Sequence, residues 1–125
     1  MLGDCKIRAM LPTTGPEAAK RFFADVLDLK LVQEYETLVL FEAGGTLLHL
    51  QKVESFTPQP FTVLGWTVAD IHATVRALSA RGVAFERFEG MAQDEDGVWR
   101  PPGSNGGVCW FKDPDGNLLS LTQAT

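Results

Sequence analysis

The run WFKDPDGNLL, at residues 110–119, has the pattern of two short strands joined by a tight turn. Proline fixes its own φ and glycine accepts a positive φ, so the segment Asp113 to Gly116 is expected to reverse the chain. Apolar residues on both sides predict strands at 108–111 and 117–122. The Asp-Pro-Asp-Gly segment is therefore assigned a structural role and no chemical one.

The strand after this turn has a counterpart earlier in the chain. Residues 45–51 (GTLLHLQ) match residues 116–122 (GNLLSLT) at the glycine and three leucines, an offset of 71 from Gly45 to Gly116. Two helix starts also correspond, at an offset of 55 from Pro16 to Ile71. The offsets differ by 16, so the second copy carries an insertion, which we place in the loop 89–107. Loops of this length in small domains often have a function.

The helix starts rest on capping patterns. Thr14 with Glu17 fits a capping box and Pro16 fits the first turn, while Asp70 is a suitable cap for a second helix that ends at Gly82. Alternating or apolar stretches predict strands at 7–11, 29–32, 37–41, 46–53, 62–68, 83–88, 108–111 and 117–122. The order strand, helix, three strands thus occurs twice, which is an α+β pattern. We expect a single domain over 1–125, with module one at 1–53, a linker at 54–61 and module two at 62–125.

With this order established, the chain resembles the vicinal oxygen chelate superfamily of glyoxalases, bleomycin resistance proteins and extradiol dioxygenases. The resemblance lies in residues 110–119, in the first-helix segment RFFADVLDL at 21–29, and in FTVL at 61–64 with ARGV at 80–83. Asp28 replaces the glycine that is usual in the helix motif. The resemblance implies two tandem βαβββ modules that form curved mixed sheets with helices on the convex side. It also implies a homodimer.

Enzymes of this family bind a divalent ion through the first and last strands of each module. The repeat places these positions at Arg8, His49, Val63 and Ser120. Only histidine among these residue types is a competent ligand, since a catalytic metal needs about three His, Asp or Glu side chains. The sequence therefore predicts a member of the family that has lost its metal site, with no cofactor and no assigned catalytic residue.

Strand alternation predicts which side chains face the concave side of the sheets. If His49 faces inward, its neighbours at alternate positions do so too, and Trp110 lines the pocket in the family pattern. The predicted ligand-binding residues are Arg8, His49, Gln51, Val63, Thr67, Trp99, Trp110, Ser120 and Thr122. An aromatic wall with a few polar groups is typical of small-molecule sites.

Several roles remain open among these residues. Arg8 either replaces the metal's charge and holds an anionic or carbonyl group, with His49 as hydrogen-bond partner or weak base, or it pairs with a strand carboxylate or solvent. Trp99 either closes over the pocket or packs on the sheet or a partner subunit. Cys109 has the opposite parity to Trp110, so it should face the helix and be unreactive.

Composition limits the partners. The formal net charge is −5 and no basic stripe is visible, so no nucleic-acid partner is expected. No apolar run reaches the roughly 18 residues of a membrane span, and the N-terminus lacks a signal-peptide pattern, so no membrane partner is expected and the cytoplasm is the predicted location. The two cysteines provide no disulfide framework.

Two functions from different classes fit these observations. The first is a metal-free protein that binds a small organic molecule in a concave sheet pocket, as bleomycin resistance proteins do. The second is an enzyme of the same superfamily (a lyase, isomerase or dioxygenase) that uses unconventional metal ligands or His49.

Overall fold

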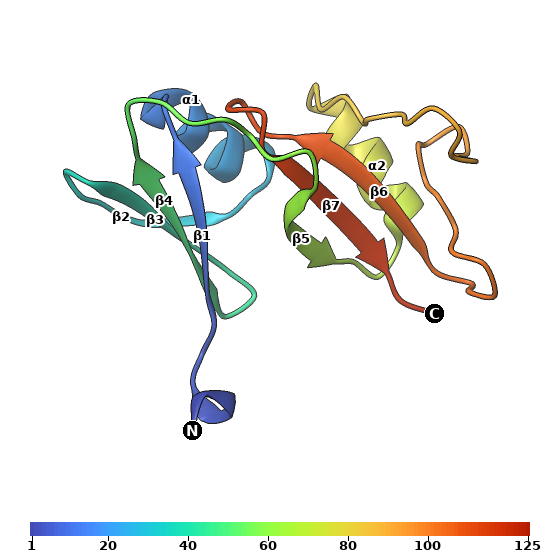
Figure 1. Cartoon of the computed structure of the whole chain (residues 1–125), viewed down its shortest axis with the longest axis horizontal. Coiled ribbons are helices and arrows are strands. Elements are labelled where there is room, and N and C mark those ends of the chain that lie inside the picture. Colours follow the sequence, from blue (N-terminus) through green and yellow to red (C-terminus); the bar gives the residue numbers. More distant parts are fainter. The chain divides into compact units, whose positions relative to one another are not determined.

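The structure, a computed structural model, describes all 125 residues and divides into two units, Met1–Thr57 and Pro58–Thr125. The boundary lies inside the predicted linker 54–61. Each unit contains one sheet and one main helical segment, as Figure 1 shows. None of the helices has the length and apolar content that a membrane crossing requires.

Unit 1 contains a four-stranded sheet in the order β1-β4-β3-β2, in which β1 and β4 are parallel and the other neighbours are antiparallel. The helix α1 continues directly into a π-helical segment, and a short 3-10 turn at Leu2–Asp4 precedes β1. The elements are β1 (Arg8–Thr13), α1 (Pro16–Lys20), the π-helical segment (Arg21–Val26), β2 (Lys30–Glu34), β3 (Leu38–Ala43) and β4 (Thr46–Lys52).

Unit 2 contains a three-stranded sheet in the order β5-β7-β6, with β5 parallel to β7 and β6 antiparallel to it. Its elements are β5 (Thr62–Thr67), α2 (Ile71–Ala80), β6 (Gly107–Lys112) and β7 (Leu118–Gln123). The predicted repeat is confirmed, because α1 begins at Pro16 and α2 at Ile71. The parallel strand pairs repeat as well: Met10 lies opposite His49 in unit 1 and Gly65 lies opposite Ser120 in unit 2.

The predicted strand at 83–88 is wrong. This segment forms only one bridge pair, Phe85 with Phe111, supported by a hydrogen bond from the Glu86 amide to the Trp110 carbonyl (2.8 Å). The next residues form no further bridge with β6. The Phe88 amide donates to the side chain of Gln93 (2.7 Å), and the Arg87 guanidinium donates to backbone carbonyls of the loop. Contacts with the inserted loop thus replace the fourth strand of the module.

The first helix start also differs from the prediction. The N-cap residue is Gly15, which has no side chain to cap the helix, and not Thr14 as the capping-box pattern predicted. Glu17 instead pairs with Lys20 (2.8 Å). The second start is confirmed, because the Asp70 carboxylate accepts a hydrogen bond from the Ala73 amide (3.1 Å). Gly82 ends α2 with φ +94°, as its predicted left-handed cap requires.

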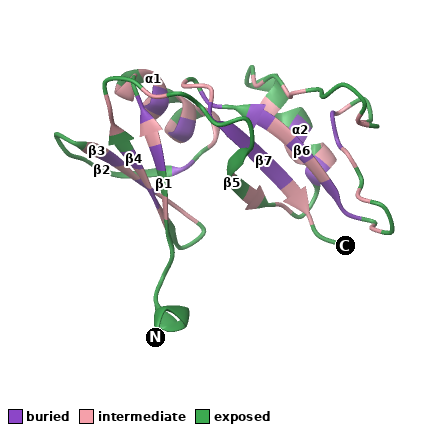
Figure 2. Cartoon of the chain, viewed as in Figure 1, coloured by how far each residue is buried: buried purple, intermediate pink, exposed green.

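Each helix covers one face of its own sheet. In unit 1 the buried ring of Phe23 lies 5.8 Å from that of Phe41 on β3, and Leu48 and Leu50 of β4 are buried on the same face. In unit 2 the corresponding face carries Phe111, Cys109, Leu119 and Leu121, which are all buried. Figure 2 shows buried stretches on the strands of both sheets and on the helices. The strand residues that face the helices are therefore those that the alternating sequence pattern predicted.

The turn at 113–116 has the predicted structural role. The buried Asp113 carboxylate accepts hydrogen bonds from the amides of Asp115 (3.0 Å) and Asn117 (2.9 Å) and from the Asn117 side chain (2.9 Å). Gly116 has φ +86°, which only glycine adopts readily. Burial raises the pKa of Asp113, and its hydrogen bonds oppose that shift. The carboxylate holds the turn through hydrogen bonds to the backbone.

Replacing Glu34 with glutamine should remove an acid-sensitive contribution to stability. Hydrogen bonds from Lys20 (2.6 Å) and Lys52 (2.8 Å) lower the pKa of Glu34 from 4.5 to about 2. A lowered carboxyl pKa stabilises the folded state above the ordinary pKa, and this contribution is lost as the pH falls through the folded value. The wild type should therefore unfold at a higher temperature than Glu34→Gln at neutral pH.

Thermal unfolding between neutral pH and about pH 2 measures this difference, which should shrink below pH 4.5 and vanish near pH 2. Glu36→Gln is the matched control, since Glu36 is an exposed glutamate two residues further along the chain. A difference that stays constant across this range would contradict the assignment.

Candidate functional site

Three of the predicted ligand-binding residues share the face of the unit 1 sheet that lies opposite its helix. Arg8 is aligned with Leu47, and His49 with Met10 and Leu40. Gln51 lies two residues beyond His49 on β4 and therefore points to the same side. The register thus brings Arg8, His49 and Gln51 onto one surface. Met10, which is 59% exposed directly beside His49, was not predicted as part of it.

Two of these side chains have free hydrogen-bonding groups. The Nδ1 atom of His49 is buried and has no hydrogen-bond partner. Arg8 is exposed and forms no ion pair or hydrogen bond, so of the alternatives to ligand binding it reaches solvent and does not pair with a strand carboxylate. Buried nitrogen atoms without partners are costly, so the Nδ1 atom of His49 is an unsatisfied polar group within unit 1.

In unit 2, four more of the predicted residues share the face opposite α2. Ser120 lies between Gly65 and Trp110, and Thr122 lies between Thr67 and Val108. A Cβ atom at Gly65 would lie 2.5 Å from the Ser120 Oγ, so glycine leaves the room that this hydroxyl occupies. The register therefore groups Thr67, Trp110, Ser120 and Thr122 on one surface.

A β-bulge alters the predicted pattern near the start of β5. Thr62 is paired with Leu118 and Leu64 with Leu119, and Val63 falls at the irregularity between them. Thr62 therefore joins the Ser120 face, and its hydroxyl accepts a hydrogen bond from the Trp110 indole (3.1 Å). Strict alternation had selected Val63 and missed Thr62. A bulge has no reliable sequence signal at this position, since it depends on the partner strand.

Three aromatic rings form a wall on this face of unit 2. Trp99 exchanges two backbone hydrogen bonds with Val108 (2.8 and 2.9 Å), so the inserted loop adds one residue to the edge of the sheet. The Trp99 ring lies 6.5 Å from that of Trp110, and the Phe88 ring meets Trp110 edge-on at 5.4 Å. Trp99 thus packs beside the sheet edge. Phe88 was not predicted, because it belongs to the segment expected to be a strand.

Cys109 faces the other side of β6, as its parity predicted. Its side chain is fully buried, and burial raises the pKa of the thiol to about 12. A thiol held protonated is a poor nucleophile. Cys5 is exposed near the N-terminus, and its thiol makes one weak contact, to the Met1 carbonyl at 3.6 Å.

The donor set does not fit the divalent ion that the family enzymes use. Of the side chains at the four expected positions, the guanidinium of Arg8 and the alkyl group of Val63 have no available lone pair, and Ser120 has only a neutral hydroxyl. No group of three or more His, Cys, Asp or Glu side chains is placed to hold a metal ion. We therefore derive no chemistry through a metal at this site.

The chain thus consists of two similar units, each with a sheet, a helix on one face of the sheet and polar or aromatic side chains on the other face. This arrangement defines a class of small α+β proteins. The family model of the glyoxalase/bleomycin resistance protein/dioxygenase superfamily matches residues 7–121, and the chain belongs to this superfamily. No curated protein sequence matches the chain.

Solved structures with the same fold include proteins of different roles. An antibiotic binding protein, TnmS3 from Streptomyces sp. CB03234, is 22% identical with a TM-score of 0.74, over 100% of this chain and 99% of that one. The fosfomycin resistance protein FosX from Listeria monocytogenes is 12% identical with a TM-score of 0.75, over 95% and 92% of the two chains. A glyoxalase/bleomycin resistance protein/dioxygenase from Alicyclobacillus acidocaldarius is 17% identical with a TM-score of 0.73, over 97% and 92%. These likenesses establish the fold.

Proposed function

We propose that this protein binds a small organic molecule on the aromatic face of unit 2, without a metal ion. The observation that carries the proposal is the wall formed by Phe88, Trp99 and Trp110 beside the hydroxyls of Ser120 and Thr122. Large apolar surfaces with a few fixed polar groups are what small-molecule sites require. The fold of an antibiotic binding protein is consistent with this role.

The geometry of the wall favours a ligand with a flat apolar part. The Trp99 and Trp110 rings are tilted by 34° at 6.5 Å, which leaves no room for a ring between them. They form adjacent parts of one surface, and a planar group can lie across both. The Ser120 and Thr122 hydroxyls then accept from or donate to polar atoms at the edge of that group.

On the face of unit 1, considered by itself, Arg8 and His49 are proposed to hold an anionic or carbonyl group of a small molecule. Both have unused hydrogen-bonding capacity, and the guanidinium adds a fixed positive charge. Gln51 extends this polar face along β4. Val63, near the start of β5, and the homodimer remain predictions.

The experiment that tests the proposal is a thermal-shift screen of purified protein against a panel of aromatic antibiotics and metabolites, with and without EDTA, together with metal analysis. We expect compounds that raise the unfolding temperature equally in both conditions, since a ligand that binds only the folded state stabilises it. Hits that disappear with EDTA, or stoichiometric Ni, Zn, Fe or Mn in the protein, would overturn the metal-free proposal. A complete lack of hits would argue against the binding role.

The buried, unpartnered Nδ1 of His49 favours one alternative, an enzyme that uses this imidazole in acid–base chemistry. Mass spectrometry of each hit compound after incubation with the protein distinguishes the two functions. A new product formed by the wild type but not by His49→Gln supports the enzyme, whereas unchanged compound supports binding alone.

Replacing Arg8 with alanine should weaken the binding of an anionic hit compound by about tenfold, because charge-assisted hydrogen bonds are lost. Titration calorimetry of the two proteins measures the effect. Arg21→Ala is the matched control, since Arg21 is an exposed arginine of the same unit on its helical segment. Equal affinity in wild type and Arg8→Ala would remove Arg8 from the site.

A further inference from the structure

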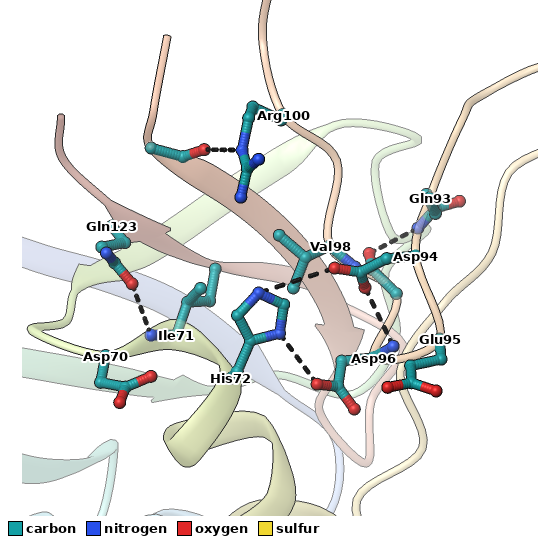
Figure 3. A network of polar contacts seen from close by, with 12 residues as sticks. Asp70, Ile71, His72, Gln93, Asp94, Glu95, Asp96, Val98, Arg100 and Gln123 are labelled. Atoms are coloured by element: carbon teal, nitrogen blue, oxygen red, sulfur yellow. Dashed lines mark hydrogen bonds and ion pairs between the residues drawn. The ribbon is translucent and has the colours of Figure 1, made fainter.

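A cluster of charged side chains joins α2 to the inserted loop. His72, in the first turn of α2, places its Nδ1 atom 2.8 Å from the Asp96 Oδ2 and its Nε2 atom 3.6 Å from the Asp94 Oδ2 (Figure 3). Arg76, one turn further along the helix, lies 3.4 Å from the same oxygen of Asp96. The imidazole is therefore flanked by two carboxylates, one at each nitrogen.

Asp94 also builds the turn that leads to Trp99. Its Oδ1 atom accepts hydrogen bonds from the amides of Asp96 and Val98 (2.9 Å each), and its own amide donates to the Val98 carbonyl (2.9 Å). Trp99 follows directly and forms its two hydrogen bonds with Val108. The carboxylate that faces the imidazole thus shapes the segment that presents the Trp99 ring.

A second set of contacts holds the loop from the other side. The Arg87 guanidinium donates to the carbonyls of Asp94 (2.7 Å) and Glu95 (2.9 Å). The Gln93 side chain donates to the carbonyls of Glu86 (3.0 Å) and Gly97 (2.8 Å). These contacts involve amides, carbonyls and a guanidinium, so they do not depend on pH near neutrality. The loop therefore has contacts that do not involve His72, and the imidazole adds two more, to Asp96 and Asp94.

The chemistry of imidazole makes this contact sensitive to protons. A neutral ring has one N–H and can donate to only one carboxylate, and its other nitrogen then directs a lone pair at the second. The protonated ring donates at both nitrogens. Histidine is the side chain that ordinarily changes charge between about pH 5 and 8. The other charged groups that face it are Asp94, Asp96, Arg76, Arg100 across the loop, and Glu95 and Asp70 nearby.

We propose that His72 is a positioning residue. Its protonated ring pairs with both Asp94 and Asp96, an arrangement that we call the clasp, and thereby fixes Trp99 beside Trp110. The consequence for ligand binding rests on the function proposed above. Protonation holds the 94–98 turn against α2, and the Trp99 ring is then more shielded. Affinity for a ligand on the aromatic wall should accordingly be about threefold higher at about pH 6 than at about pH 8, within the range of partly exposed ion pairs.

Acrylamide quenching of tryptophan emission tests the clasp without any ligand. In the wild type, quenching should be weaker at about pH 6 than at about pH 8, and His72→Gln should lose this pH dependence, since glutamine cannot be protonated. The chain has two histidines, so His49→Gln is the matched control and should keep the wild-type profile. Trp99→Phe should also lose the pH dependence, because the reporting ring is gone.

Two outcomes would overturn the clasp: a His72→Gln protein with the wild-type quenching profile, or a pH dependence that persists in Trp99→Phe. The quenching data do not depend on a ligand, so they stand even if the screen above finds no compound. Conversely, a compound bound equally well at both pH values, by a protein whose quenching does change, would retain the clasp and remove its effect on binding.

Discussion

Replacing Phe111 with alanine should lower the free energy of unfolding by about 3–5 kcal/mol, the range measured for large buried aromatic side chains. The Phe111 side chain is fully buried on the α2 side of β6. Its ring stacks on Trp66 at 6.2 Å and contacts Phe85 at 5.5 Å. Alanine leaves a cavity between these rings, which the surrounding side chains fill only in part.

Denaturant unfolding followed by tryptophan fluorescence measures this loss, because all three tryptophans lie in unit 2. Phe61→Ala is the control. Phe61 is 58% exposed in the same unit, and its replacement should change the free energy of unfolding by less than about 0.5 kcal/mol. Similar losses for the two variants would show that Phe111 does not occupy the core as described.

Replacing Trp110 with alanine should weaken the binding of the best compound from the screen by about tenfold to hundredfold, as for aromatic residues at the centre of binding surfaces. Trp110 is adjacent to Phe111 in sequence but faces the opposite side of the sheet, where it is only partly buried. It contacts both Trp99 and Phe88. Its removal therefore disrupts the whole aromatic wall, while the core behind it stays in place.

Titration calorimetry measures the affinity, and thermal unfolding checks that the variant is folded. Trp110→Phe is the matched control. It keeps an aromatic face and loses the indole N–H that donates to Thr62, so its affinity should lie between those of the wild type and the alanine variant. A folded Trp110→Ala protein that binds as the wild type does would exclude this face as the binding surface. On this one strand, Phe111→Ala should therefore mainly reduce the free energy of unfolding, and Trp110→Ala should mainly reduce the affinity for the compound.

The sequence by itself determined the features that depend on local periodicity and on the repeat. The offsets of 55 and 71 predicted that the helices and the last strands of the two modules correspond, and α1 begins at Pro16 and α2 at Ile71. The alternation of side chains along the strand correctly predicted that Cys109 and Trp110 lie on opposite faces of the sheet. These features are encoded within a few residues, since strand period and turn chemistry are local properties.

Only the tertiary structure decided the features that depend on a distant partner. The bulge that exchanges Val63 for Thr62 arises in the pairing of β5 with β7. The segment 83–88 leaves the sheet because Arg87 and Phe88 find partners in the inserted loop. His72 meets Asp96 across 24 residues of chain. Periodicity shows which face a side chain occupies, but the choice among competing partners is made by hydrogen bonds between segments that are far apart in sequence.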